Sequence, residues 1–171
     1  MSRPAQMFDH YLDARKGWPS PYAVDKAAEL VDVDTTVVAG QVMSLDANAR
    51  FDHGLVENGV AIFAIQNDDD FDVVSDDGGL VGGAGGRPKM SGLVALGAFE
   101  LESTEYDTNG VYLPNTPLTS PAHGVANAGR LEVGVVYTDT ICGIVSDGEV
   151  TSENYGVSVL RFWPAWLPVI P

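Results

Sequence analysis

The side chains that could carry out acid–base or metal chemistry are few in this chain and widely spaced. The three histidines, His10, His53 and His123, show no His-x-His or His-x-x-x-His spacing, so the sequence predicts no metal site. His123 has no recognisable nucleophile partner, and no Gly-x-Ser-x-Gly turn is present. The single cysteine, Cys142, lies in an apolar run and is predicted to be a buried, unreactive thiol. We therefore expect no catalytic residue, no cofactor and no enzymatic activity.

Two segments resemble ligand-binding loops without matching them. The glycine-rich segment 82–89 lacks the Gly-Lys-Ser/Thr ending of a phosphate loop, and Pro88 disfavours the helix that would follow. In the acidic run 67–78, Asp68, Asp70 and Asp72 would take the first, third and fifth positions of a calcium loop. Val73 then stands where the glycine of such a loop is needed, and Gly79 stands where its closing glutamate belongs. These patterns favour a flexible loop and a solvated acidic turn, with an irregular calcium site as the alternative for the second.

Charge narrows the classes of partner. The net charge is −15 over 171 residues, and it is unevenly distributed. Residues 1–26 hold four basic and three acidic groups, whereas the remaining 145 hold five basic and 21 acidic groups. Such a body repels nucleic acid and anionic membrane surfaces, and it favours solubility or a basic partner. No apolar run approaches the roughly 20 residues of a membrane span, and residues 1–6 lack the apolar stretch of a signal peptide.

The elements that would position any functional side chain are β-strands. Apolar or alternating runs suited to strands recur between clusters of Gly, Pro, Asn and Asp, at 35–46, 60–65, 71–74, 93–102, 130–137, 140–145 and 156–162. No β-α-β rhythm is present, so the sequence predicts a mainly β fold, a small antiparallel barrel or sandwich. The runs at 60–65, 93–99, 131–136, 141–145 and 157–160 are expected to form one core. The long segments 76–91 and 106–127 are expected to be loops.

Both ends of the chain are rich in aromatic residues and proline. We expect an N-terminal arm over 1–31, a β body over 32–161 and an aromatic, Pro-rich tail over 162–171. The spacing of apolar residues in 5–16 predicts a short helix, and 25–30 a second helical turn. The tail either packs on its own domain or docks on a neighbouring subunit. The predicted partner-binding residues are the aromatics of these two ends, namely Phe8, Tyr11, Trp18, Tyr22, Trp163 and Trp166.

A family resemblance rests on residues 40–46, Phe51, the small-residue run 60–65 and the ending 154–164. Together these stretches resemble the small β domains and C-termini of tailed-bacteriophage head decoration (cement) proteins. The resemblance implies a β-tulip-like fold and a structural role on the virion. The protein would bind the outside of the capsid, clamp neighbouring major capsid protein subunits and form a homo-oligomer, a trimer. It would be made in the host cytoplasm, and the family supplies no catalytic residues.

Two other functions remain open from the sequence. A ligand- or carbohydrate-binding β module of a larger assembly would present a strip of exposed aromatics, for which Tyr106, Tyr112 and Tyr137 are the candidates. A hydrolase would require His123 to meet a carboxylate and a nucleophile in one pocket.

Overall fold

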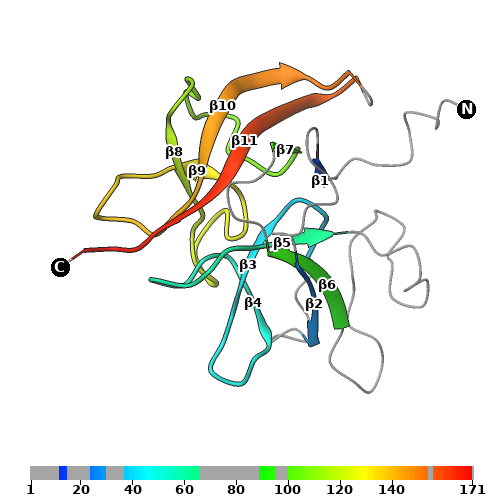
Figure 1. Ribbon diagram of the computed structural model, residues 1–171, viewed down its shortest axis with the longest axis vertical. Coiled ribbons are helices and arrows are strands. Elements are labelled where there is room, and N and C mark those ends of the chain that lie inside the picture. Colours follow the sequence, from blue (N-terminus) through cyan, green and yellow to red (C-terminus); the bar gives the residue numbers. More distant parts are fainter. Residues whose placement is uncertain are drawn as a thin grey trace, which may run out of the picture.

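The structure is a computed structural model that describes residues 12–14, 24–29, 37–65, 89–94, 100–153 and 156–170. Within these residues the chain forms eleven β-strands and no helix. The strands build two antiparallel sheets, which lie one above the other in the view of Figure 1. The mainly β, antiparallel fold expected from the alternating apolar runs is therefore confirmed.

The larger sheet has six strands, and its centre is one long hairpin. This hairpin consists of β10 (Ile141–Thr151) and β11 (Ser158–Leu167). β7 (Leu101–Ser103) and then β1 (Leu12–Ala14) flank β11. β8 (Pro117–Thr119) and then β9 (Glu132–Val133) flank β10. The middle of β11 is therefore paired on both sides, and it runs diagonally across Figure 1 toward the C-terminal end.

The smaller sheet has five strands in the order β2-β6-β5-β3-β4. β5 (Ile62–Ile65) is central because its run of apolar residues suits a strand covered on both faces. It pairs with β6 (Lys89–Val94) on one side and β3 (Val42–Leu45) on the other. β2 (Val24–Glu29) and β4 (Phe51–His53) form the two edges.

One apolar core joins the two sheets. The rings of Phe63 on β5 and Phe162 on β11 lie 5.4 Å apart, and both side chains are fully buried. Around them lie side chains from both sheets, Val42, Leu55, Ala61, Leu101, Tyr106, Tyr112, Leu118, Leu131, Cys142, Val145 and Leu160. Burial of these side chains is the main stabilising contribution to such a small domain. The predicted single core is confirmed at 61–64, 131, 141–142, 145 and 159–160. Val60 and three valines of the predicted run 131–136, Val133, Val135 and Val136, are exposed, so the prediction is wrong there. Only Glu132–Val133 of that run form a strand, β9, at the edge of the larger sheet. Residues 95–99 lie outside the described part.

Three expectations need correction where the structure describes them. Residues 12–14 and 24–29 are strands, so the helices predicted at 5–16 and 25–30 are wrong there. Their backbone groups pair with β7 and β6, and strand pairing outweighs a weak helical preference. The predicted loop 106–127 contains β8, and residues 89–91 of the other predicted loop begin β6. β11 continues to Leu167, and β1 and β2 pair with β7 and β6, so strand pairing joins residues of the predicted arm and tail to the predicted β body.

Candidate functional site

The C-terminal half of β11 changes from buried to exposed along its length. Phe162 is 0% exposed, whereas Trp163 and Trp166 are 44% and 43% exposed. Pro164 is buried and lies opposite Gly143 in the register with β10. β11 therefore contributes both to the core and to the aromatic surface of this end of the molecule.

Hydrogen bonds fasten the end of the chain to two neighbouring turns. The indole Nε1–H of Trp166 donates to the carbonyl oxygen of Gly59 at 3.1 Å. The N–H of Val169 donates to Oδ1 of Asn58 at 2.8 Å, and the N–H of Ile170 donates to the carbonyl of Tyr137 at 3.4 Å. Of the two placements left open by the sequence, the structure shows residues 166–170 lying on their own domain.

The second of these turns presents Tyr137. This side chain is 63% exposed, and its backbone has φ 73°, a conformation that bulky side chains rarely adopt. The turn is fixed by Asp139, whose Oδ2 accepts from the N–H of Val135 at 2.7 Å and whose N–H donates to the Val135 carbonyl. A strained, exposed aromatic held by its surroundings is a feature that clusters at binding sites.

Each of these three segments carries exposed apolar side chains, and the hydrogen bonds hold the segments together. We call the four side chains the tail patch: Val60, Tyr137, Trp166 and Ile170. Asn58 links the segments further, because its N–H donates to Oγ1 of Thr140 at 2.7 Å. Exposed apolar side chains on neighbouring segments of a folded domain are a feature of sites of protein contact. The tail patch is the candidate functional site, and what it can do chemically is bind, by burying apolar area.

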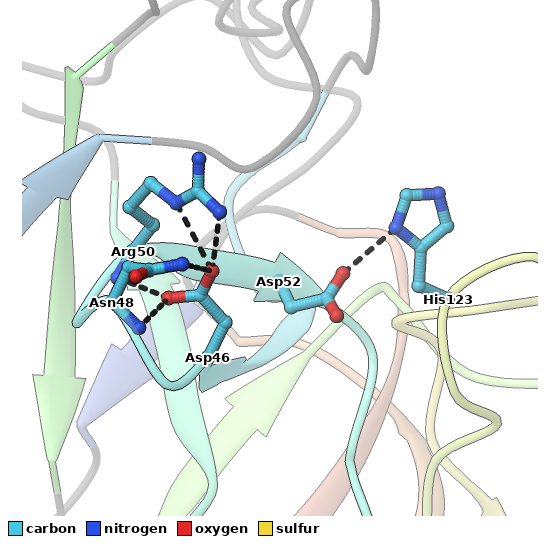
Figure 2. Close-up of polar contacts among 5 residues, drawn as sticks. All are labelled: Asp46, Asn48, Arg50, Asp52 and His123. Carbon is cyan, nitrogen blue, oxygen red and sulfur yellow. Dashed lines mark hydrogen bonds and ion pairs between the residues drawn. The ribbon is translucent and has the colours of Figure 1, made fainter.

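A second region collects polar groups around β4. Nδ1 of His123 lies 2.7 Å from Oδ1 of Asp52. Figure 2 shows these two side chains pointing toward each other. The adjacent His53 lies with its Nε2 2.9 Å from Oε1 of Gln41. We call these four residues the histidine cluster. The loop 121–130 closes over it, and the Gly129 carbonyl accepts from the N–H of Val42 at 2.7 Å.

His53 sits in a close-fitting place within this cluster. Burial is the main cause that lowers its pKa, and the nearby His123 lowers it further, against the raising effects of Asp52 and Glu105. Gly129 has φ 81°, and a Cβ atom there would collide with the His53 ring. The imidazole is therefore neutral near pH 7 and packed against backbone.

The histidine cluster resembles half of a catalytic site. A carboxylate beside an imidazole can orient a general base, but a nucleophile must lie within hydrogen-bond reach as well. Within the described residues, neither imidazole hydrogen-bonds to a hydroxyl or a thiol. Cys142 is 1% exposed, and burial raises the pKa of its thiol to about 12. In the same part of the chain, no group of three or more His, Cys, Asp or Glu side chains is placed to hold a metal ion.

The turn before β4 has a purely local role. Oδ1 of Asp46 accepts from the N–H groups of Asn48 and Arg50, both at 2.8 Å, and its Oδ2 accepts from the Arg50 guanidinium (Figure 2). The backbone N–H of Arg50 is the largest cause that lowers the pKa of Asp46 to about 2. This arrangement fixes the β3–β4 hairpin.

The predicted partner-binding residues divide into two sets. Trp163 and Trp166 are described, and both are substantially exposed on β11. Phe8, Tyr11, Trp18 and Tyr22 lie outside the described residues, as does the acidic run 67–78. Sequence reasoning did not place Val60 and Ile170 at the site. The one signal that could have found them is their apolar character beside turn residues.

The tyrosines offered as an exposed strip separate in the structure. Tyr106 and Tyr112 are 3% and 8% exposed and pack edge to face in the core. The Tyr106 hydroxyl donates to Glu149 at 2.8 Å, and the Tyr112 hydroxyl donates to the Asp107 carbonyl at 2.7 Å. Only Tyr137 of the three faces solvent.

No protein-family model matches this chain, and no curated protein matches it in sequence. Within the described residues, no helix is long and apolar enough to cross a membrane.

Proposed function

We propose that this protein is a non-enzymatic structural protein of a bacteriophage virion. It binds the outer surface of the capsid and stabilises contacts between major capsid protein subunits. The proposal also includes a homo-oligomer, a trimer, and a β-tulip-like arrangement of the two sheets. The resemblance of residues 40–46, 60–65 and 154–164 to head decoration proteins suggests this role.

The observation that carries the proposal is the tail patch. It exposes two large aromatic side chains, Tyr137 and Trp166, on a turn and a strand held by hydrogen bonds. Aromatic anchors on a rigid surface bind with little loss of conformational entropy. A decoration protein needs such a surface, because it works by adhesion and not by turnover.

Surface charge supports the same conclusion. Among residues with described side chains, acidic groups outnumber the three arginines, and each arginine has an acidic partner. A strongly acidic exterior keeps a protein soluble at high local concentration, as many copies on a shell require. The alternative function, a ligand- or carbohydrate-binding β module with a strip of exposed tyrosines, is less well supported, since Tyr106 and Tyr112 are buried.

A head-binding assay tests the proposal. Expanded heads of the phage that encodes the chain, prepared without this protein, are mixed with it and sedimented, and bound protein is measured against concentration. Saturable binding, with heads that resist heat or chelators better after binding, is the expected result. Heads that bind nothing over the accessible concentration range would contradict it.

A further inference from the structure

Acidic residues lie on or next to the segments that carry the tail patch. Glu57 is exposed and precedes Asn58, which holds the chain end at Val169. Asp139 closes the turn that carries Tyr137, and Glu132 lies on the edge strand β9 just before that turn. The exposed apolar side chains of the patch therefore have acidic neighbours, and we call Glu57, Glu132 and Asp139 the acidic rim.

No described cation neutralises this rim. The three arginines with described side chains are engaged with other partners: Arg50 with Asp46, Arg130 with Glu105 and Arg161 with Glu102. Burial is the main cause that raises the pKa of Glu132, and the negative charges of Asp107 and of Asp139 in the rim raise it further. Negative potential is thus concentrated beside the apolar centre.

We propose that the tail patch is the docking surface for a protein partner whose contact face has an apolar centre and Lys or Arg side chains at its rim. The identity of that partner as a capsid subunit rests on the proposed function, whereas its chemistry follows from the patch itself. Apolar burial supplies most of the affinity, and complementary charge supplies orientation and speed of association.

Charge also decides against a second copy of this chain as the occupant. A two-fold contact places the same patch on both sides, so Glu57 and Asp139 would face their own copies or each other. Like charges brought together in an interface are unfavourable at this surface. A basic rim on the partner removes that penalty.

The patch is suited to docking because little has to be ordered when it binds. Trp166 is fixed by its bond to Gly59, and Ile170 by its bond to Tyr137. The turn at Tyr137 is fixed by Asp139. We expect Tyr137 and Trp166 to be the anchors, since aromatic side chains dominate binding at such surfaces.

Two synthetic peptides of equal length test the chemistry, one alternating Leu with Arg and the other Leu with Glu. Each is titrated into the full-length, isotope-labelled protein, and backbone amide NMR shifts are recorded. The Arg peptide should shift residues 57–60, 135–140 and 166–170 in a saturable manner and bind at least about tenfold more tightly than the Glu peptide. Raising the salt should weaken its binding. Equal binding of both peptides, or shifts confined to other residues, would overturn the proposal.

Three single variants locate the contact. Tyr137→Asn removes the aromatic ring but tolerates the positive φ, and it should weaken binding of the Arg peptide about tenfold or more. Glu57→Lys should weaken binding of the Arg peptide and should not weaken binding of the Glu peptide. Leu113→Ala is the matched control, because Leu113 is an exposed apolar residue in another loop, and it should bind as the wild type does. If all three variants bind the Arg peptide equally, the patch is not the docking surface.

Two further measurements separate this inference from the proposed function. If wild-type protein binds the Arg peptide at the patch but never binds heads, the docking surface stands and the virion role fails. If folded Tyr137→Asn loses the peptide but covers heads as the wild type does, the virion role stands and this surface is not its contact. Sedimentation of the protein without any partner tests whether a second copy of the chain occupies the patch. Self-association that Tyr137→Asn abolishes would assign the patch to a second copy and overturn the proposal.

Discussion

The tail patch and the histidine cluster are both assembled from distant segments, yet they differ in what they leave unsatisfied. In the histidine cluster, each imidazole has a hydrogen-bond partner, and a loop closes over β4. In the tail patch, the polar groups of the chain end are bonded, but Tyr137 and Trp166 remain exposed. The polar groups of the histidine cluster are bonded to one another within the fold, whereas the tail patch retains exposed apolar area that a partner can bury.

The sharpest form of this comparison lies within one strand. Phe162 fills the core between the sheets, and the next residue, Trp163, is about half exposed. Phe162→Ala should lower the free energy of unfolding by about 3–5 kcal/mol because it leaves a cavity. Trp163→Ala, the matched control, should lower it by about 1 kcal/mol or less. Urea denaturation measures both. Similar losses in the two variants would show that β11 does not separate core from surface.

The close fit of the histidine cluster predicts the next largest effect. Gly129→Ala places a Cβ atom against the His53 ring at φ 81°, and we expect a loss of about 2 kcal/mol or more in unfolding free energy. Gly124→Ala is the matched control, since its φ is 80° and its Cβ would meet nothing within 4 Å. It should show only the backbone cost, roughly 1 kcal/mol. Equal losses would mean that the His53 contact adds nothing.

His53 in the histidine cluster should contribute to the pH dependence of stability. The folded state lowers the pKa of His53, chiefly through burial, so the unfolded chain binds its proton more readily. This contribution to stability is complete above the unfolded pKa, about 6.5, and is lost as the pH falls through the lower folded value.

Urea denaturation between pH 7.5 and 5 measures the effect. His53→Gln, whose amide N–H can still donate to Gln41, should give a flatter profile than the wild type over this range. Tyr137→Asn should leave the slope unchanged. A slope identical in wild type and His53→Gln would exclude His53 as its source.

The smallest expected change concerns the fastening of the chain end. Trp166→Phe keeps an aromatic ring but removes the Nε1–H donor to Gly59, so the unfolding free energy should fall by about 0.5–1 kcal/mol. Trp166→Ala should cost more, yet less than Phe162→Ala. A loss as large as that of Phe162→Ala would make Trp166 a core residue and remove it from the tail patch.

An element of this fold can be predicted from the sequence where the local residue pattern determines it. It cannot be predicted where contacts with residues distant in the sequence determine it. Apolar runs of strand length between turn residues, at 60–65 and 141–145, predict strands, and β5 and β10 lie there. The segment 25–30 was predicted to be helical, and residues 24–29 are instead the edge strand β2. Its alanines and charged residues carry only a weak preference, and pairing with β6 outweighs it.

By itself, the sequence determined a mainly β chain with an acidic body, a buried lone cysteine and an aromatic C-terminal end. Only the tertiary structure decided which aromatics are exposed. Tyr106 and Tyr112 enter the core, whereas the positive φ at Tyr137 turns an identical side chain outward. It also brought His53 and His123 into one cluster from 70 positions apart in the sequence. The physical reason is that residue type sets what can be buried, but sheet pairing and turn geometry determine which copies of that type are buried.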